Sequence, residues 1–156
     1  MALEIERKFL VLNEYLPPLQ DGQYIVQGYL SETPSIRYRF LDESIVITIK
    51  EHKKDGSRFE FETLNPISSY EERSTLKRLS LAPPIEKIRY RVPLEGLIWE
   101  IDVYQAENMG LITVDVEMPD LGYHLNFPKW VNTQREITCD LEFSNMNLGK
   151  RPYATW

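Results

Sequence analysis

The chain has 156 residues, of which 42% are apolar and 27% charged, and its mean hydropathy is −0.38. These values are typical of one globular domain, taken here as residues 1–156. They argue against a disordered, fibrous or membrane protein, because no apolar run approaches the roughly 18 residues of a membrane-spanning helix. The formal net charge of −6 argues against general binding of nucleic acid, which depends on a surplus of Lys and Arg.

The hydrophobic periodicity predicts a mainly β protein. Alternating apolar and polar residues, separated by turn-forming residues, indicate eight strands. They lie near residues 3–12, 23–32, 35–41, 44–51, 57–63, 85–92, 97–104 and 111–118. Between the fifth and sixth strands, Asn65 and Pro66 fit the N-cap and first residue of a helix of about three turns. From Pro128 onward the pattern is mixed, and a short helix is expected around Trp130.

Charged residues share one face of nearly every predicted strand, because alternate side chains in a strand point to opposite faces. Such a row on one strand is ordinarily a solvent-facing surface above an apolar core. Here the rows contain almost no uncharged polar residues, and basic and acidic residues dominate different strands, unlike a solvated surface. The charged residues are Glu4, Glu6 and Lys8, then Arg37 and Arg39, Lys50, then Arg58, Glu60 and Glu62, then Lys87 and Arg89, then Glu100 and Asp102, and finally Asp115 and Glu117.

The rows are best explained by an eight-stranded antiparallel β-barrel or tunnel with a charged lumen, flanked by a few helices. Charges in a lumen that excludes most water must pair with one another, with metal ions or with a charged ligand. Arg and Lys suit phosphate oxygens, and clustered carboxylates suit Mg²⁺ or Mn²⁺. The predicted ligand is therefore a metal-bound triphosphate or polyphosphate, free or attached to an organic group. The apolar outer faces would be covered by helices, the C-terminal segment or a second subunit in a homodimer.

In their order, these motifs resemble the CYTH superfamily, or triphosphate tunnel metalloenzymes, named after class IV adenylate cyclases and thiamine triphosphatases. Residues 4–8, EIERK, resemble its ExExK motif, and the later rows follow in order through residue 118. The resemblance implies an eight-stranded β-tunnel that binds triphosphate substrates with a divalent metal.

The resemblance also implies roles for individual residues. The phosphates would be bound by Lys8, Arg37, Arg39, Lys50, Arg58, Lys87 and Arg89. The metal would be held by Glu4, Glu6, Asp115 and Glu117. Catalysis would involve Lys87, Tyr29 as its partner, and Glu60 or Glu62 as activator of water. The alternative is that the charges only form internal ion pairs and that Tyr29 only packs in its strand.

Two departures from the family pattern concern substrate fit. Many relatives carry T-x-D-x-R-Y near the C-terminus, whereas residues 138–143 are TCDLEF, so that Glu142 reverses the expected charge. Glu51 follows Lys50 where relatives often have Gly. Both departures affect how the tunnel is closed and shaped.

The favoured function is metal-dependent hydrolysis of inorganic tripolyphosphate or a related triphosphate. One alternative is a class IV-type adenylate cyclase, for which no residue set identifies an adenine pocket. Another is a non-catalytic polyphosphate- or nucleotide-binding module, which Glu142 favours. No nucleic-acid or membrane partner is expected. The charged start of the chain lacks the apolar core of a secretory leader, and the single Cys139 leaves no internal disulfide, so we expect a cytoplasmic protein.

Overall fold

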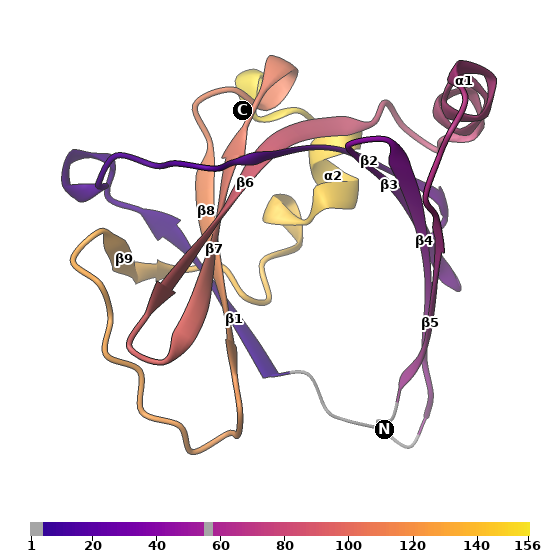
Figure 1. Ribbon diagram of the computed structural model, residues 1–156. Coiled ribbons are helices and arrows are strands. Elements are labelled where there is room, and N and C mark those ends of the chain that lie inside the picture. Colours follow the sequence, from indigo (N-terminus) through magenta and orange to yellow (C-terminus); the bar gives the residue numbers. More distant parts are fainter. Residues whose placement is uncertain (1–4, 55–57) are drawn as a thin grey trace.

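The computed structural model describes residues 5–54 and 58–156, and its main feature is one antiparallel sheet of nine strands (Figure 1). The order across the sheet is β5-β4-β3-β2-β6-β7-β8-β1-β9. All eight predicted strands are present, and a ninth, β9, was not predicted. The strands are β1 (Ile5–Val11), β2 (Gln23–Ser31), β3 (Ser35–Leu41), β4 (Ser44–His52), β5 (Arg58–Asn65), β6 (Ile85–Leu94), β7 (Leu97–Tyr104), β8 (Ile112–Met118) and β9 (Val131–Glu136).

The described strands curl into a tunnel without closing into a complete barrel. The outermost strands of the sheet order, β5 and β9, do not pair with each other. In Figure 1, β1 and β5 lie on opposite sides of the curve. The predicted tunnel is therefore confirmed as a curled sheet, whose two edge strands are not joined by hydrogen bonds within residues 5–54 and 58–156.

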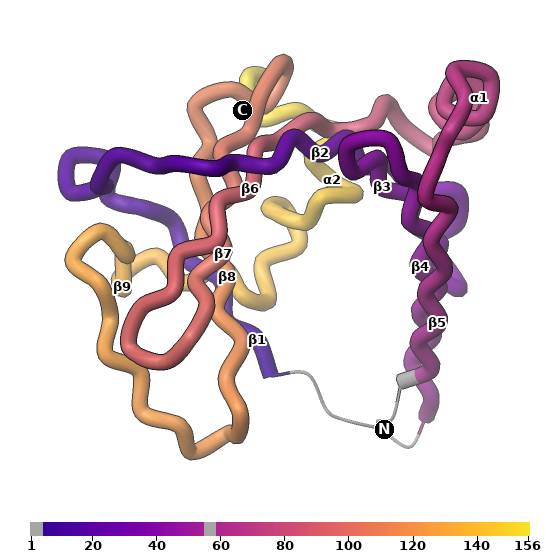
Figure 2. Tube along the Cα trace, in the orientation of Figure 1, coloured from indigo at the N-terminus to yellow at the C-terminus, as the bar shows by residue number. Residues whose placement is uncertain are grey.

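One outer face of the sheet is covered by the segment between β8 and β9. Phe9, Trp99 and Val116 point outward and pack with Leu125 and Trp130 of that segment in one buried cluster. Figure 2 shows the segment leaving β8 and returning to β9 on the side away from β4 and β5. This packing confirms that the apolar faces point outward and that part of the chain itself covers them.

The main helix begins later than the sequence pattern suggests. Helix α1 spans Tyr70–Leu79, and its N-cap is Ser69. Ser69 accepts a hydrogen bond from the backbone of Glu72, whose side chain accepts one from the backbone of Ser69. Asn65 is the last residue of β5, so the predicted start at Asn65 and Pro66 is wrong. The reciprocal capping box satisfies two helix-end donors, which a lone Asn cap does not.

The helix expected around Trp130 is also absent from this described part of the chain. Trp130 is buried against Trp99, with ring centroids 6.0 Å apart, and the chain then extends into β9. β9 pairs with β1, where Val11 lies opposite Val131. Strand pairing and aromatic packing thus override the weak local pattern.

The C-terminal segment returns to the concave side of the sheet. Helix α2 (Asn145–Lys150) lies inside the curve in Figure 1. Its Leu148 is fully buried and packs in a cluster with Ile85, Tyr104 and Phe143. No described helix is long and apolar enough to cross a membrane.

Candidate active site in the tunnel

A cavity of about 510 Å³ opens on the concave side of the sheet. Strands β1 to β8 each contribute at least one side chain to its wall, because their inward residues alternate with apolar outward residues. Of the residues predicted from the sequence, those lining it are Glu6, Lys8, Arg37, Arg39, Lys50, Glu60, Glu62, Lys87, Arg89, Asp115 and Glu117. Glu4 and the side chain of Arg58 lie outside the described part of the structure. The predicted set is thus brought together almost entirely.

On the wall formed by β6 and β7, two cations share one buried carboxylate. The side chain of Asp102 is 0% exposed and that of Lys87 only 2%. Lys87 Nζ donates to Asp102 Oδ2 at 2.9 Å, and Arg89 Nε donates to Asp102 Oδ1 at 2.7 Å. A second donor of Arg89, Nη2, reaches Asp102 Oδ2 at 2.8 Å. This wall is therefore held together by charge-assisted hydrogen bonds.

The pKa values of these groups follow from burial and from the ion pairs. Burial would raise the pKa of Asp102, but Lys87 and Arg89 outweigh it and hold that pKa well below its ordinary value. Burial lowers the pKa of Lys87 to about 8, although Asp102 favours its charged form. Burial and the ion pair with Asp102 thus act on this lysine in opposite directions.

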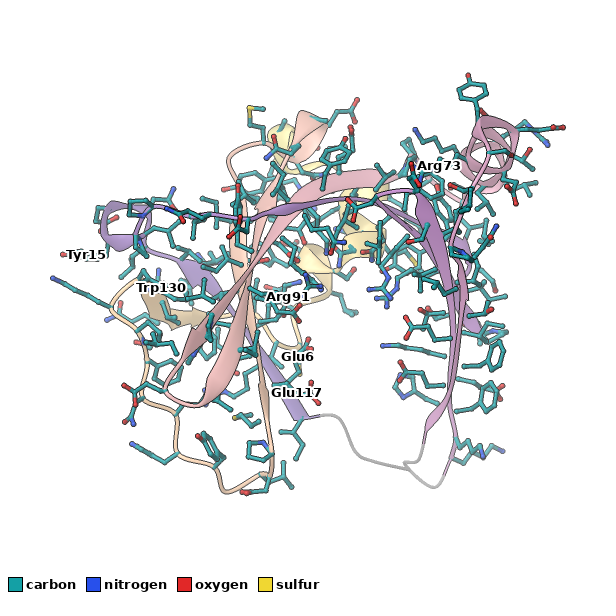
Figure 3. All side chains as sticks on the ribbon, in the orientation of Figure 1. Glu6, Tyr15, Arg73, Arg91, Glu117 and Trp130 are labelled. Carbon is teal, nitrogen blue, oxygen red and sulfur yellow. The ribbon has the colours of Figure 1, made fainter. Side chains whose placement is uncertain are left out.

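A group of carboxylates lies on β1 and β8. Glu6 is directly opposite Glu117 on the neighbouring strand, an arrangement of like charges that destabilises a sheet. Figure 3 shows the two side chains on the inner side of the curve. Burial, and then the charge of Asp115, raise the pKa of Glu6 from 4.5 to about 7. Burial also raises the pKa of Asp115, whose Oδ1 atom is buried without a hydrogen-bond partner.

Lys8, opposite Asp115, and Arg89, 4.0 Å from it, offset only part of this negative charge, because the pKa values of Glu6 and Asp115 stay raised. The group therefore fits a hard divalent cation, which takes carboxylate oxygens as ligands. Among the residues that the structure describes, no group of three or more His, Cys, Asp or Glu side chains is arranged to hold a metal ion by itself. The acidic residues at this place are Glu6, Asp115 and Glu117. The Oδ1 atom of Asp115 has no hydrogen-bond partner, and this is the clearest indication of a cation site there.

Across the cavity, β3 presents two neighbouring guanidinium groups. The Nε atoms of Arg37 and Arg39 are both buried without a hydrogen-bond partner. Arg39 Nη2 donates to Glu62 at 2.5 Å, whereas Arg37 forms no ion pair with any described residue. Burial, and then repulsion from Arg37, lower the pKa of Arg39. Two adjacent, incompletely paired guanidinium groups suit a ligand that carries several negative charges.

The sequence and structure of known proteins identify the family. A curated protein named inorganic triphosphatase, from Acetivibrio thermocellus, is 36% identical over 158 residues, which covers 100% of this chain and 99% of that protein. The chain belongs to the CYTH superfamily. The crystal structure of the inorganic triphosphatase NE1496 aligns with a TM-score of 0.69 at 26% identity, over 96% of this chain and 95% of that one.

A more distant solved structure shares the CYTH fold alone. It is a proposed adenylate cyclase from Bacillus halodurans, which aligns with a TM-score of 0.53 at 16% identity, over 76% of this chain and 81% of that one. No family model matches the sequence.

One predicted site residue of this CYTH protein lies away from the cavity wall. The hydroxyl of Tyr29 accepts a hydrogen bond from Gln27 Nε2 at 2.9 Å. Lys87, its expected partner, instead donates to Asp102. The expected pairing of Tyr29 with Lys87 is therefore replaced by two separate contacts, and a catalytic role of Tyr29 stays a prediction.

Several wall residues were not assigned to the site from the sequence. Glu100 was placed in the inward row of β7 from the sequence but was given no role. Gln27 lies in the inward row of β2, so the period-two pattern could have found it. Thr138 and Asn145 come from the C-terminal segment, which has no regular period. Asn145 Oδ1 accepts a hydrogen bond from Tyr104 at 2.7 Å, which fixes this segment at the inner end of the cavity.

The departure at Glu142 lies away from the cavity. Its side chain is 60% exposed, and its Oε1 atom lies 3.7 Å from Nη1 of Arg151. The reversed charge is thus met by a local cation. Glu142 therefore gives no structural support to a non-catalytic interpretation.

Proposed function

We propose that the protein hydrolyses inorganic tripolyphosphate, or a closely related triphosphate, in this cavity with a divalent metal ion. The observation that carries the proposal is the presence, in one cavity, of incompletely paired Arg37 and Arg39 and of repelling Glu6 and Asp115. A metal-bound polyanion neutralises both groups at once. The relative from Acetivibrio thermocellus, named an inorganic triphosphatase, supports the same activity.

The phosphates would lie among the cations of the wall. Arg37 and Arg39 line the cavity, and their guanidinium groups would each donate to phosphate oxygens. Further contacts would come from Lys8, Lys50, Lys87, Arg89 and, by position in the sequence, Arg58. A cavity of about 510 Å³ suits a compact anion of this kind.

Glu6, Asp115 and Glu117 would hold Mg²⁺ or Mn²⁺, with Glu4 added from its place in the sequence motif. The bound ion supplies neutralisation of charge on the phosphate oxygens. For attack on the terminal phosphorus, Glu60 or Glu62 would accept the proton from water as the bond to the bridging oxygen breaks. Lys87 and Arg89 would stabilise the charge that develops on the leaving pyrophosphate.

The test is phosphate release from tripolyphosphate, ATP and thiamine triphosphate, each with Mg²⁺, Mn²⁺ or a chelator. We expect metal-dependent release, strongest for tripolyphosphate, and its loss in the double variant Glu4→Gln with Glu6→Gln. Tight binding without release would contradict hydrolysis and favour a binding module. Formation of cyclic AMP from ATP would favour a cyclase.

A homodimer and a cytoplasmic location complete the proposal. Phe59 and Phe61 point outward on β5 and are 44% and 52% exposed, a surface that a second copy could cover. Cys139 is an exposed free thiol, which suits a reducing compartment. Light scattering at micromolar concentration is expected to give about twice 18.4 kDa, and the mass of one chain would contradict the dimer.

A further inference from the structure

Asp102 occupies an unusual place behind the cavity. It points inward from β7 and is completely buried, yet it does not itself line the cavity. Between it and the cavity lie Lys87 and Arg89, which do line the cavity. Asp102 accepts one hydrogen bond from Lys87 and two from Arg89, at 2.7–2.9 Å.

These contacts fix two side chains that are otherwise among the most flexible in proteins. An ordered Lys or Arg loses up to about 2 kcal/mol of rotamer entropy, and here the loss is met on folding, before any ligand binds. The fork of Arg89 is held by two bonds, so the orientation of its plane is set as well as its position.

The arrangement is poorly explained by stability alone. A buried ion pair is often no more stabilising than apolar residues of similar volume, because the charges lose their hydration. Arg89 also lies 3.3 Å from Glu100 and 4.0 Å from Asp115. Its charge would therefore be partly neutralised even without Asp102. Two cations held rigidly at a cavity wall are suited to stabilising negative charge on a ligand at one defined position.

We infer that Asp102 is a positioning residue, which holds Lys87 and Arg89 as one rigid clamp for the phosphate group that reacts or leaves. The inference rests on the proposed function. It predicts that loss of Asp102 separates binding from turnover. Without its negative charge the cavity is more positive and binds a polyanion at least as well, but the two cations are no longer held for the transition state.

The test compares Asp102→Asn with the parent protein and with Glu86→Gln. Glu86 lies next to Lys87 on the outer face of β6, and its carboxylate accepts a hydrogen bond from Tyr24, so this control removes a bonded carboxylate without touching the cavity. Titration calorimetry with tripolyphosphate and a chelator measures binding, and phosphate release with Mg²⁺ measures kcat and KM.

For Asp102→Asn we expect unchanged or tighter binding at one ligand per chain, and a fall in kcat of about 30- to 100-fold. Glu86→Gln should stay within about twofold of the parent. A kcat close to that of the parent in fully binding Asp102→Asn would overturn the inference. A fall in kcat matched by an equal fall in binding stoichiometry would also overturn it, since a partly unfolded sample behaves in that way.

A second variant, Asp102→Glu, keeps the charge but moves the carboxylate by one methylene group. We expect about a tenfold lower kcat, and full parental kcat would show that charge alone matters and would contradict positioning. If neither variant shows a cooperative unfolding transition, Asp102 is a folding residue and the inference is wrong. If the parent itself releases no phosphate, the proposed function fails first, which separates the two failures.

Discussion

The two walls of the tunnel carry the same kinds of side chain but satisfy them differently. On β6 and β7, Lys87 and Arg89 are bound to buried Asp102. On β3, Arg37 has no ion pair among the described residues, and the Nε atoms of both Arg37 and Arg39 lack a partner.

The outer faces of the two walls differ in the same direction. Trp99 on β7 is fully buried under Trp130, whereas Phe61 on β5 is 52% exposed. The β6–β7 wall thus has its inner charges paired and its outer face covered, whereas the β3–β5 wall has incompletely paired cations inside and exposed aromatic rings outside. Under the proposed function, a phosphate ligand would complete the inner face of this wall at β3, where Arg37 has no ion pair among the described residues.

The largest effect on activity is expected for Lys87→Ala, which removes one of the two cations bound to Asp102 on the β6–β7 wall. It removes a phosphate ligand and leaves buried Asp102 with Arg89 alone, so we expect kcat/KM to fall about 1,000-fold and the unfolding free energy by about 3 kcal/mol. Lys54→Ala, an exposed control, should change neither. Steady-state kinetics and urea unfolding measure the two quantities, and equal effects of both variants would contradict the assignment.

The outer faces are compared by Trp130→Ala and Phe61→Ala. Trp130 is 5% exposed, so its loss leaves a cavity, and we expect about 3–5 kcal/mol lower unfolding free energy. Phe61→Ala should cost less than about 1 kcal/mol within one chain, because its ring is half exposed. Urea unfolding measures both free energies. A large loss of unfolding free energy for Phe61→Ala at all protein concentrations would show that the outer face of β5 is packed within one chain, as that of β7 is.

Arg37→Ala should uncouple activity from stability on the incomplete wall. We expect kcat/KM to fall about 100-fold, since a phosphate contact is lost. The unfolding free energy should change by less than about 0.5 kcal/mol, because no ion pair is broken. A loss of stability as large as that of Lys87→Ala would remove the difference between the walls.

The smallest effect is expected in the pH dependence of the melting temperature of the metal-free protein. The pKa of Glu6 is about 7 in the folded chain, above its ordinary 4.5, so its protonated form stabilises the fold at low pH, and this contribution is lost as pH rises through 7. Glu6→Gln removes this pH-dependent loss of stability, because the amide stays uncharged at every pH tested. Its melting temperature with chelator should exceed the parent's by a few degrees at pH 8 and equal it at pH 4, as thermal unfolding would show. A higher melting temperature for the parent at pH 8 would contradict this.

Much of the fold follows from the sequence because a strand has a period of two. The inward rows, such as Lys87 and Arg89, alternate with apolar residues and so fix both the strands and their faces. β9 was missed because residues 131–136, VNTQRE, are mostly polar and exposed on an edge. The helix start could have been found, since Ser69 and Glu72 have the spacing of a capping box.

The site was predictable where it lies on strands and less so elsewhere. Asp102 was visible in an inward row, but its burial behind Lys87 and Arg89 depends on how side chains of neighbouring strands meet. Asn145 reaches the cavity only because the C-terminal segment folds back, and no local pattern indicates this. The extent of the single domain, residues 1–156, stays a prediction.

Under the proposed function, one cavity holds a metal ion on its β1–β8 side and a triphosphate on its β3 side. A crystal structure with tripolyphosphate and Mn²⁺ tests it most directly, because the anomalous signal locates the ion independently of the phosphates. We expect Mn²⁺ at Glu6, Asp115 and Glu117, with phosphate oxygens bound by Arg37 and Arg39. Phosphates bound outside the cavity, or an ion remote from these carboxylates, would contradict the account.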